Sequence, residues 1–278
     1  MRDMQRITTF SPLQKILSSF LNSFQDAAAP ISAMNGKLVG GYLRSSGTTI
    51  SVSPIRSLVI GNTYSSTAVA TVLTPGSGGV PSLTTDTWYV VYAGISGGTI
   101  AFTVEEYVGN EPDLALVFKD GDATLRYLGS FVSYTDSGTK IVPFLQHPGG
   151  LVRYNQRLDS HILLDTLTDA TAPPHDVDNN VDLSTRAPAH TSTVVLRCML
   201  SGPTDKFRVC FRNPGLTGYE GTEFKVELGT DETKRTFHVG PVEGDGTQVI
   251  EVRTTTDGAT LDALEIYCDG YIEQDTRG

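Results

Sequence analysis

The 278-residue chain has few charged residues and few cysteines, and it lacks a long apolar run. Only 19% of its residues are charged, and 21 basic residues against 31 acidic ones give a formal net charge of −10. The longest basic cluster is Lys234-Arg235, whereas a nucleic-acid-binding protein needs a basic face that neutralises phosphates. The composition therefore argues against a nucleic-acid partner.

No stretch approaches the roughly 18 apolar residues of a membrane span, and the N-terminus lacks the charged, apolar and small-residue order of a secretory signal. We expect a soluble protein made in a cytoplasm, without membrane insertion. The three cysteines cannot all pair within one chain. Cys198 shares the apolar side of segment 194–200, whereas Cys210 falls on the polar side of segment 206–212 and should point outward. Opposite faces do not favour a bridge, so we expect reduced thiols.

The abundant residues are those of turns and extended strands. The chain holds 28 glycines and 14 prolines together with many serines and threonines, which is typical of short strands joined by tight turns. Between residues 48 and 144, apolar and β-branched runs recur at short intervals, and similar runs return from 191 onward. We predict a mainly β protein with two antiparallel β-sandwich or jelly-roll-like domains.

The stretch from 87 to 131 carries the strongest strand pattern. Trp88, the only tryptophan, begins a run to Tyr92 that is aromatic or β-branched at both alternating positions. Such a run fits a central strand covered on both faces. A glycine-rich turn at 94–98 and an alternating run at 99–104 predict its hairpin partner. The turn also fits the G-x-S-x-G pattern, but a nucleophile elbow needs a helix after the serine, so we interpret it as a hairpin turn.

This stretch resembles a β-module of fibre and appendage proteins of tailed bacteriophages. The residues that carry the resemblance are Thr87 to Tyr92, Phe102, Pro112, Gly121-Asp122 and Arg126-Tyr127-Leu128-Gly129. The chain departs from the pattern at Leu125, where a second arginine is common. The resemblance implies a structural or host-attachment protein of the virion, a homotrimer assembled in the host cytoplasm. It implies a packing signature and specifies no chemistry.

The first 35 residues contain the pattern of an amphipathic helix. Ser11 and Pro12 supply a cap and a first-turn proline, and the pattern ends before Pro30. The apolar stripe, at spacings of three and four, consists of Leu13, Ile16, Leu17, Phe20, Leu21 and Phe24. This stripe packs on the protein's own sheet, meets two other copies along a threefold axis, or docks into another virion protein. Two heptads are too few to hold a coiled coil alone, so the β-domains should supply most of the trimer contact.

Composition along the chain predicts four regions. Residues 1–35 form the N-terminal anchoring or trimerisation helix, and residues 36–147 form the first β-domain. Residues 148–190 are interpreted as an extended connector draped over a surface, in which 158–167 forms one strand or a short helix and 172–180 is rich in Pro, Asp and Asn. Residues 191–278 form the C-terminal β-sandwich.

No catalytic constellation is found in the sequence. The histidines are His147, His161, His175, His190 and His238. They share no zinc-type spacing with one another or with the cysteines, so we expect surface or loop positions for most of them. Segment 176–187 begins like a calcium loop, but Val181 and Ala187 stand where glycine and glutamate are needed. The acidic pairs at 105–106 and 231–232 are interpreted as solvated. We predict no enzyme, no metal site and no cofactor.

Exposed aromatic residues among polar loops are the candidate binding residues, because sugar rings stack on aromatic faces. Tyr219 in the loop 213–221 and Tyr267 on the outward side of the last strand are the candidates. Together these features predict a homotrimeric bacteriophage fibre or spike, attached through its N-terminus to tail, collar or capsid proteins. Its C-terminal domain would bind host-surface polysaccharide. A capsid decoration protein and a glycan-cleaving depolymerase are the alternatives.

Overall fold

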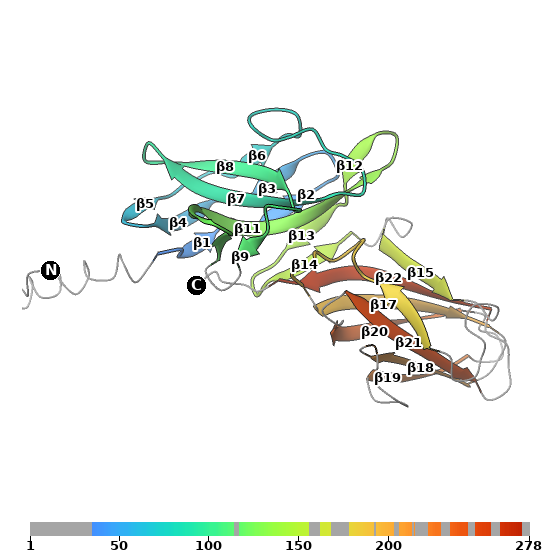
Figure 1. The fold of residues 1–278 in the computed structure, drawn as a ribbon. Coiled ribbons are helices and arrows are strands. Elements are labelled where there is room, and N and C mark those ends of the chain that lie inside the picture. The colour runs from blue at the N-terminus through green and yellow to red at the C-terminus, as the bar shows by residue number, and fades with distance from the viewer. Residues whose placement is uncertain are drawn as a thin grey trace, which may run out of the picture.

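The computed structural model describes residues 35–113, 117–155, 162–167, 178–191, 193–202, 206–212, 214, 222–228, 234–243, 248–256 and 262–273. Every element bounded within these residues is a β-strand, and all the strand pairs are antiparallel, which confirms the mainly β class. Figure 1 shows two lobes, one formed by residues 35–146 and coloured blue to green, the other by residues 151–273 and coloured yellow to red. The expected helix and its six apolar residues lie outside the described residues, as does Tyr219.

Two sheets and part of a third build the first lobe. The three-stranded sheet has the order β1-β4-β5 and consists of β1 (Leu38–Gly40), β4 (Ile55–Ile60) and β5 (Thr63–Ser65). The six-stranded sheet has the order β8-β7-β11-β10-β9, with β12 paired to β11. Its strands are β7 (Trp88–Ser96), β8 (Thr99–Glu106), β9 (Pro112–Asp113), β10 (Phe118–Lys119), β11 (Asp122–Thr135) and β12 (Thr139–Ile141).

A nine-stranded sheet runs through both lobes in the order β20-β17-β22-β14-β13-β2-β3-β6, with β15 also paired to β22. Its first-lobe strands are β2 (Leu43–Ser45), β3 (Ile50–Val52), β6 (Thr71–Leu73) and β13 (Phe144–Gln146). Its second-lobe strands are β14 (Leu151–Tyr154), β15 (Leu163–Leu167), β17 (Thr193–Ser201), β20 (Lys234–Glu243) and β22 (Ala263–Ile272). The lobes are therefore joined by backbone hydrogen bonds between β13 and β14.

A four-stranded sheet completes the second lobe. It has the order β16-β21-β18-β19 and consists of β16 (Asp178–Asp182), β18 (Lys206–Arg212), β19 (Thr222–Glu227) and β21 (Val249–Thr256). Alternate side chains of β18, such as Phe207 and Val209, share one buried core with Leu196 of β17 and Ile266 of β22. Since each strand turns one side inward with a period of two, the two sheets pack as layers of a sandwich.

The predicted central strand and hairpin are confirmed. β7 lies between β8 and β11, and both of its faces are covered. Tyr89 and Val91 point into the main core, whereas Val90 and Tyr92 belong to a second buried cluster. The hairpin turns at Gly97-Gly98, where both φ angles are positive, so glycine is the residue that fits without strain.

Three segments that the sequence interpretation placed in a connector are strands. β14 pairs with β13 and β22, β15 continues along the same edge of β22, and β16 pairs with β21. Val152 and Tyr154 are buried and Arg153 is exposed, which is the alternation of a strand with one covered face. A connector that only drapes over a surface is therefore wrong for these segments, because the sheet itself passes through them.

The cysteines are free and buried, in agreement with the expected thiols. Burial raises the pKa of the Cys268 thiol to about 12 and that of Cys198 further. The outward position expected for Cys210 is wrong, because its side chain is fully buried. The second face of β18 is covered at this end, where Arg212 is also buried and pairs with Glu251 at 3.0 Å.

Candidate functional site at the junction of the lobes

A carboxylate lies buried where the two lobes meet. Glu273 follows β22 directly, and its side chain is only 2% exposed. Its Oε1 accepts hydrogen bonds from the Tyr127 hydroxyl at 2.7 Å and from the Ser130 N–H at 3.1 Å. Its Oε2 accepts one from Gln146 Nε2 at 3.1 Å. Three donors of the first lobe thus surround a carboxylate of the second, and such bonds to an ionised group are stronger than those between neutral groups.

His190 extends this cluster. Its ring is 7% exposed and stacks on the Tyr107 ring, with centroids 5.6 Å apart. Nδ1 lies 3.1 Å from the Tyr107 hydroxyl, and Nε2 lies 3.2 Å from the Tyr127 hydroxyl. The ring thus bridges the two tyrosine hydroxyls, and its Nε2 also lies 3.6 Å from Glu273 Oε1. His190 lies in a turn before β17, a loop position of the kind expected for most histidines, and its ring is nevertheless buried.

The tyrosine hydroxyls at the junction act as fixed donors. Burial, and then the nearby Glu273 carboxylate, raises the pKa of Tyr127 and that of Tyr271 well above 10. Burial, and then Glu111, raises the pKa of Tyr107 to about 12. Tyr271 donates to the Ser130 carbonyl at 2.9 Å. These phenols stay protonated at neutral pH, so Tyr127 donates to the buried Glu273 carboxylate and Tyr271 to the Ser130 carbonyl, and both bonds join the lobes.

Residues of the phage-like pattern lie at this junction. The Trp88 indole donates from Nε1 to the Ser184 carbonyl of the second lobe at 2.7 Å, and its ring lies edge-on to Tyr271 at 5.8 Å. Tyr127 donates to Glu273. Gly129 has no room for a side chain, because a Cβ there would lie 2.9 Å from Gln146 Nε2. All three residues therefore have packing roles at the junction.

Arg126, also part of that pattern, lies inside the first lobe. Its side chain is among the largest fully buried ones, and the residue is 1% exposed. Nε donates to the Gly36 carbonyl at 2.6 Å, and Nη1 donates to the carbonyls of Val117 and Tyr127 at 3.0 and 2.7 Å. A buried guanidinium that satisfies backbone acceptors fixes the segments it joins.

Tyr267, a binding residue proposed from the sequence, lies outside the Glu273 cluster. Tyr267 is 6% exposed, because the guanidinium of Arg197 covers its ring at 4.3 Å and Arg197 is held by Asp269 at 3.2 Å. The exposed position expected for Tyr267 is therefore wrong. Glu105, expected to be solvated, pairs with Lys119 at 2.7 Å.

The sequence interpretation missed Glu273 and His190. The apolar alternation predicts a last strand over 264–267, whereas β22 continues to Ile272. Period-two alternation from Tyr267 would place Tyr271 and Glu273 on the outer side, but a register shift, in which Val195 pairs with Gly270 and Leu196 with Cys268, turns the end of β22 inward. The partners of His190 come from distant segments, so its sequence neighbours give no comparable signal.

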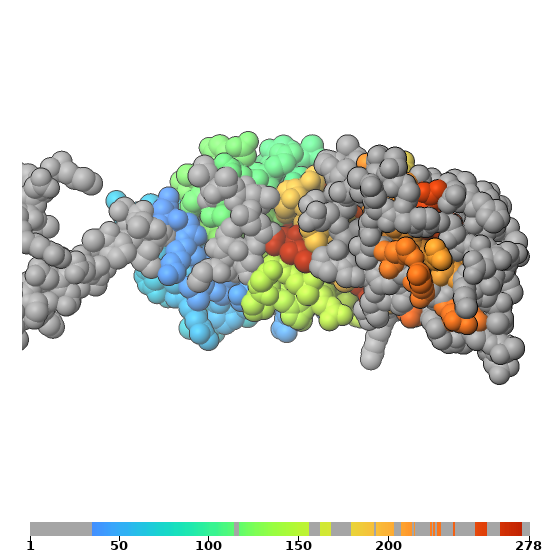
Figure 2. Space-filling view, turned by 90° about the horizontal axis from the view of Figure 1, so that it is seen from below, coloured from blue at the N-terminus to red at the C-terminus, as the bar shows by residue number. Residues whose placement is uncertain are grey.

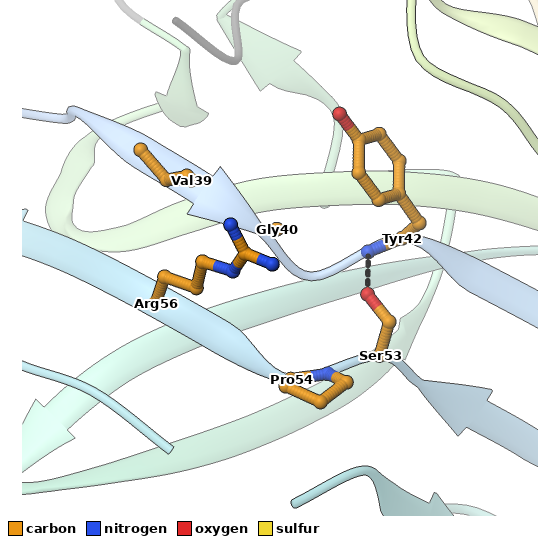
Figure 3. A pocket seen from close by; sticks show the side chains of 6 residues that line it. All are labelled: Val39, Gly40, Tyr42, Ser53, Pro54 and Arg56. Atoms are coloured by element: carbon orange, nitrogen blue, oxygen red, sulfur yellow. Dashed lines mark hydrogen bonds between the residues drawn. The ribbon is translucent and has the colours of Figure 1, made fainter. Parts of the chain in front are cut away.

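The surface of the first lobe and of its junction with β14 carries two hollows. The first, of about 400 Å³, is shown in Figure 3 and is lined by Val39, Gly40, Tyr42, Ser53, Pro54 and Arg56. The second, of about 570 Å³, is lined by Ser45, Ser46, Pro143, Phe144, Leu145, His147, Arg153, Tyr154 and Asn155. Within the described ranges, no group of three or more His, Cys, Asp or Glu side chains is arranged to hold a metal ion. None of the described residues forms a helix able to cross a membrane.

No protein-family model matches the chain, and no curated protein matches it. Among solved structures, the chain is similar to one from the cowpea mosaic virus top component, naturally occurring empty particles. The TM-score is 0.29 at 10% sequence identity, and the match covers 70% of this chain and 76% of that one. These comparisons assign the chain to no family.

Proposed function

We propose that the chain is a non-enzymatic structural protein of a virus particle, a homotrimeric fibre or spike of a tailed bacteriophage. The observation that carries the proposal is the position of the phage-like pattern. Trp88, Tyr127 and Gly129 come together where the two β-lobes join, and each has a packing role there. Packing roles for these residues suit a structural protein that must keep its two lobes in a fixed arrangement.

The sheet arrangement supports a rigid elongated component. One sheet continues through both lobes, and the Glu273 cluster ties the same lobes together on its inner side. In our proposal the N-terminal segment attaches to the tail, collar or capsid, and the second lobe faces outward. Three copies at one tip would convert a weak contact with a host polysaccharide into avidity. Of the two proposed tyrosines, Tyr219 is the remaining candidate for that contact.

The surroundings of Glu273 favour this function over a glycan-cleaving enzyme. A glycosidase needs two carboxylates on either side of a bound sugar. Both oxygens of Glu273 accept hydrogen bonds from the protein itself, and the side chain is 2% exposed. Its geometry suits the structural role, and we expect no release of reducing sugar from host polysaccharide.

Light scattering of the purified chain and mass spectrometry of purified particles test the proposal. With a chain mass of 29.9 kDa, a trimer has a mass of about 90 kDa, and a monomeric mass at micromolar concentration would contradict the trimer. The chain should be present in intact particles, and its absence would contradict the virion role. Cryo-electron microscopy would then separate a fibre or spike from a decoration protein spread over the capsid.

Deletion of residues 1–30 tests the attachment. The shortened chain should remain folded, which circular dichroism checks, because in our proposal the deleted segment serves attachment. Particles assembled with it should lack the protein. Full occupancy in those particles would overturn the anchoring role.

A further inference from the structure

Three exposed arginines have no side-chain partner among the described residues. Arg44, Arg56 and Arg153 are exposed, and within the described part of the chain they make neither an ion pair nor a side-chain hydrogen bond. The buried arginines differ, since Arg126 bonds three carbonyls and Arg197 pairs with Asp269. The exposed guanidiniums are therefore free to meet groups from outside the chain.

Two of these arginines belong to a row that crosses five strands of the nine-stranded sheet. The strand register places side by side, on one face, Val72, Ser51, Arg44, Leu145 and Arg153. We call this row the basic strip. Leu145 is 46% exposed between the two arginines, and Val72 is 59% exposed at the end of the row. With neighbouring strands roughly 4.8 Å apart, the strip is about 20 Å long.

The basic strip adjoins both hollows. Leu145 and Arg153 line the larger hollow. The smaller hollow is lined by Tyr42, which precedes Arg44 by two residues, and by Arg56, the third arginine (Figure 3). Blue and yellow-green segments of the first lobe and of β14 share the face seen from below in Figure 2. This surface thus carries positive charge, exposed apolar side chains and two hollows.

The segments that build this face contain no acidic residue. Neither 27–85 nor 137–158 includes an aspartate or glutamate, although the whole chain has a net charge of −10. Acids of the first lobe are concentrated in 105–122, which contains six acidic residues and one lysine, Lys119. The positive and negative charges of this lobe are therefore separated between different surfaces.

The acidic segment lies on the other layer of the lobe, at the end of the six-stranded sheet. We call it the acidic edge, and its members are Glu105, Glu106, Val108, Glu111 and Asp120. Glu105, Glu111 and Asp120 lie close together, since the Asp120 N–H donates to the Glu111 carbonyl at 3.0 Å and Lys119, next to Asp120, pairs with Glu105 at 2.7 Å. Val108 is 84% exposed within this edge. Like the basic strip, the acidic edge therefore pairs charge with an exposed apolar side chain.

We propose that the basic strip of one copy of this chain docks onto the acidic edge of a second copy. This inference rests on the proposed homotrimer and names its interface. Because the two surfaces differ, the contact is head-to-tail, and a rotation of one third of a turn closes it into a ring. Leu145 and Val108 supply apolar contact at its centre, and the opposite charges favour encounter and fix the register.

Charge reversal tests the interface. The paired changes Arg44→Glu with Arg153→Glu on the strip, and Glu111→Lys with Asp120→Lys on the edge, should each weaken association about tenfold or more at 50 mM salt. All four changes in one chain should restore association to within about threefold of the native value. The matched control is Arg208→Glu, an exposed arginine of β18 away from both surfaces, which should leave association unchanged. Sedimentation equilibrium measures the constants, and circular dichroism checks that each variant is folded.

Three results would overturn the interface. A native chain that stays monomeric at 50 mM salt removes it together with the trimer. A strip variant that keeps the native mass shows that the trimer uses another surface and leaves the proposed function standing. If the strip variant loses binding to dextran sulfate while its mass is unchanged, the strip binds an anionic glycan instead. Absence of the chain from particles, by contrast, would contradict the proposed function and leave a measured interface intact.

Discussion

The two faces of the nine-stranded sheet differ in whether their polar side chains have partners among the described residues. On β13, Gln146 points inward to the junction, where it donates to Glu273, and its neighbour Leu145 points outward into the basic strip. Every polar contact of Glu273 on the inner face is made within the chain. The arginines of the outer face have no such partner among the described residues. Charges satisfied internally stabilise the fold, whereas unsatisfied exposed charges are available to a partner.

The largest effect should come from filling the space where β14 and β22 join the lobes. A Cβ at Gly270 would lie 2.0 Å from the Val152 carbonyl oxygen, a backbone atom that cannot turn aside. We expect Gly270→Ala to lower the free energy of unfolding by about 3 kcal/mol or more, measured by urea denaturation. Gly94→Ala is the control, because its closest neighbours lie at 3.3 Å. Equal midpoints for the two variants would contradict the tight strand contact.

Removal of the buried carboxylate should have the next largest effect. Glu273→Ala leaves the Tyr127 hydroxyl, the Ser130 N–H and the Gln146 amide without their acceptor. We expect a loss of about 3 kcal/mol in the free energy of unfolding. Glu273→Gln should lose less, because one amide oxygen still accepts.

The matched control for Glu273 is Asp262→Ala, at an exposed acid just before the same strand. It should change the free energy of unfolding by less than about 0.5 kcal/mol. A comparable loss in both variants would show that net charge, and not the junction, determines the result.

The hairpin of β7 and β8 was predictable, because the alternation of apolar and polar residues is a local pattern. Which sheet each strand joins was not predictable. The apolar run from Lys140 to Phe144 predicts one strand, yet β12 ends at Ile141 and β13 begins at Phe144. β12 pairs with β11, and β13 pairs with β2 and β14, so one short run serves two sheets. The five residues from 140 to 144 do not by themselves determine that the first part joins one sheet and the last residue another.

The junction escaped prediction because its partners are far apart along the chain. Tyr127 and Glu273 are separated by 146 residues, and each has an ordinary local sequence. Tyr267 was placed on the correct outer side of β22, but the side chain of Arg197 on the next strand covers it. Period-two alternation gives the face of a strand and does not show what lies over that face.

Alkaline pH should reduce the stability that the buried tyrosines of the inner face contribute before it affects the charged side chains of the outer face. Burial raises the pKa of Tyr127, Tyr154 and Tyr271 well above 10. An unfolded tyrosine loses its proton near pH 10, so the stability these groups contribute is complete below pH 10 and falls as the pH rises beyond it. We expect each to lower the free energy of unfolding by about 1.4 kcal/mol per pH unit there. Tyr271→Phe should reduce that slope, measured by urea denaturation between pH 9 and 11.5, and an unchanged slope would contradict its burial.

The smallest effect on stability should come from the outer face. Arg44→Ser and Arg153→Ser remove exposed side chains that have no partner among the described residues, so each should change the free energy of unfolding by less than about 0.5 kcal/mol. The comparison is Arg126→Met, which removes the donor from three buried carbonyls and should cost about 3 kcal/mol. If urea denaturation below the concentration of self-association gave the three variants similar losses, the arginines of the strip would be part of the fold. A loss confined to Arg126→Met would leave the strip free for a partner, because its charges then contribute nothing to the single chain.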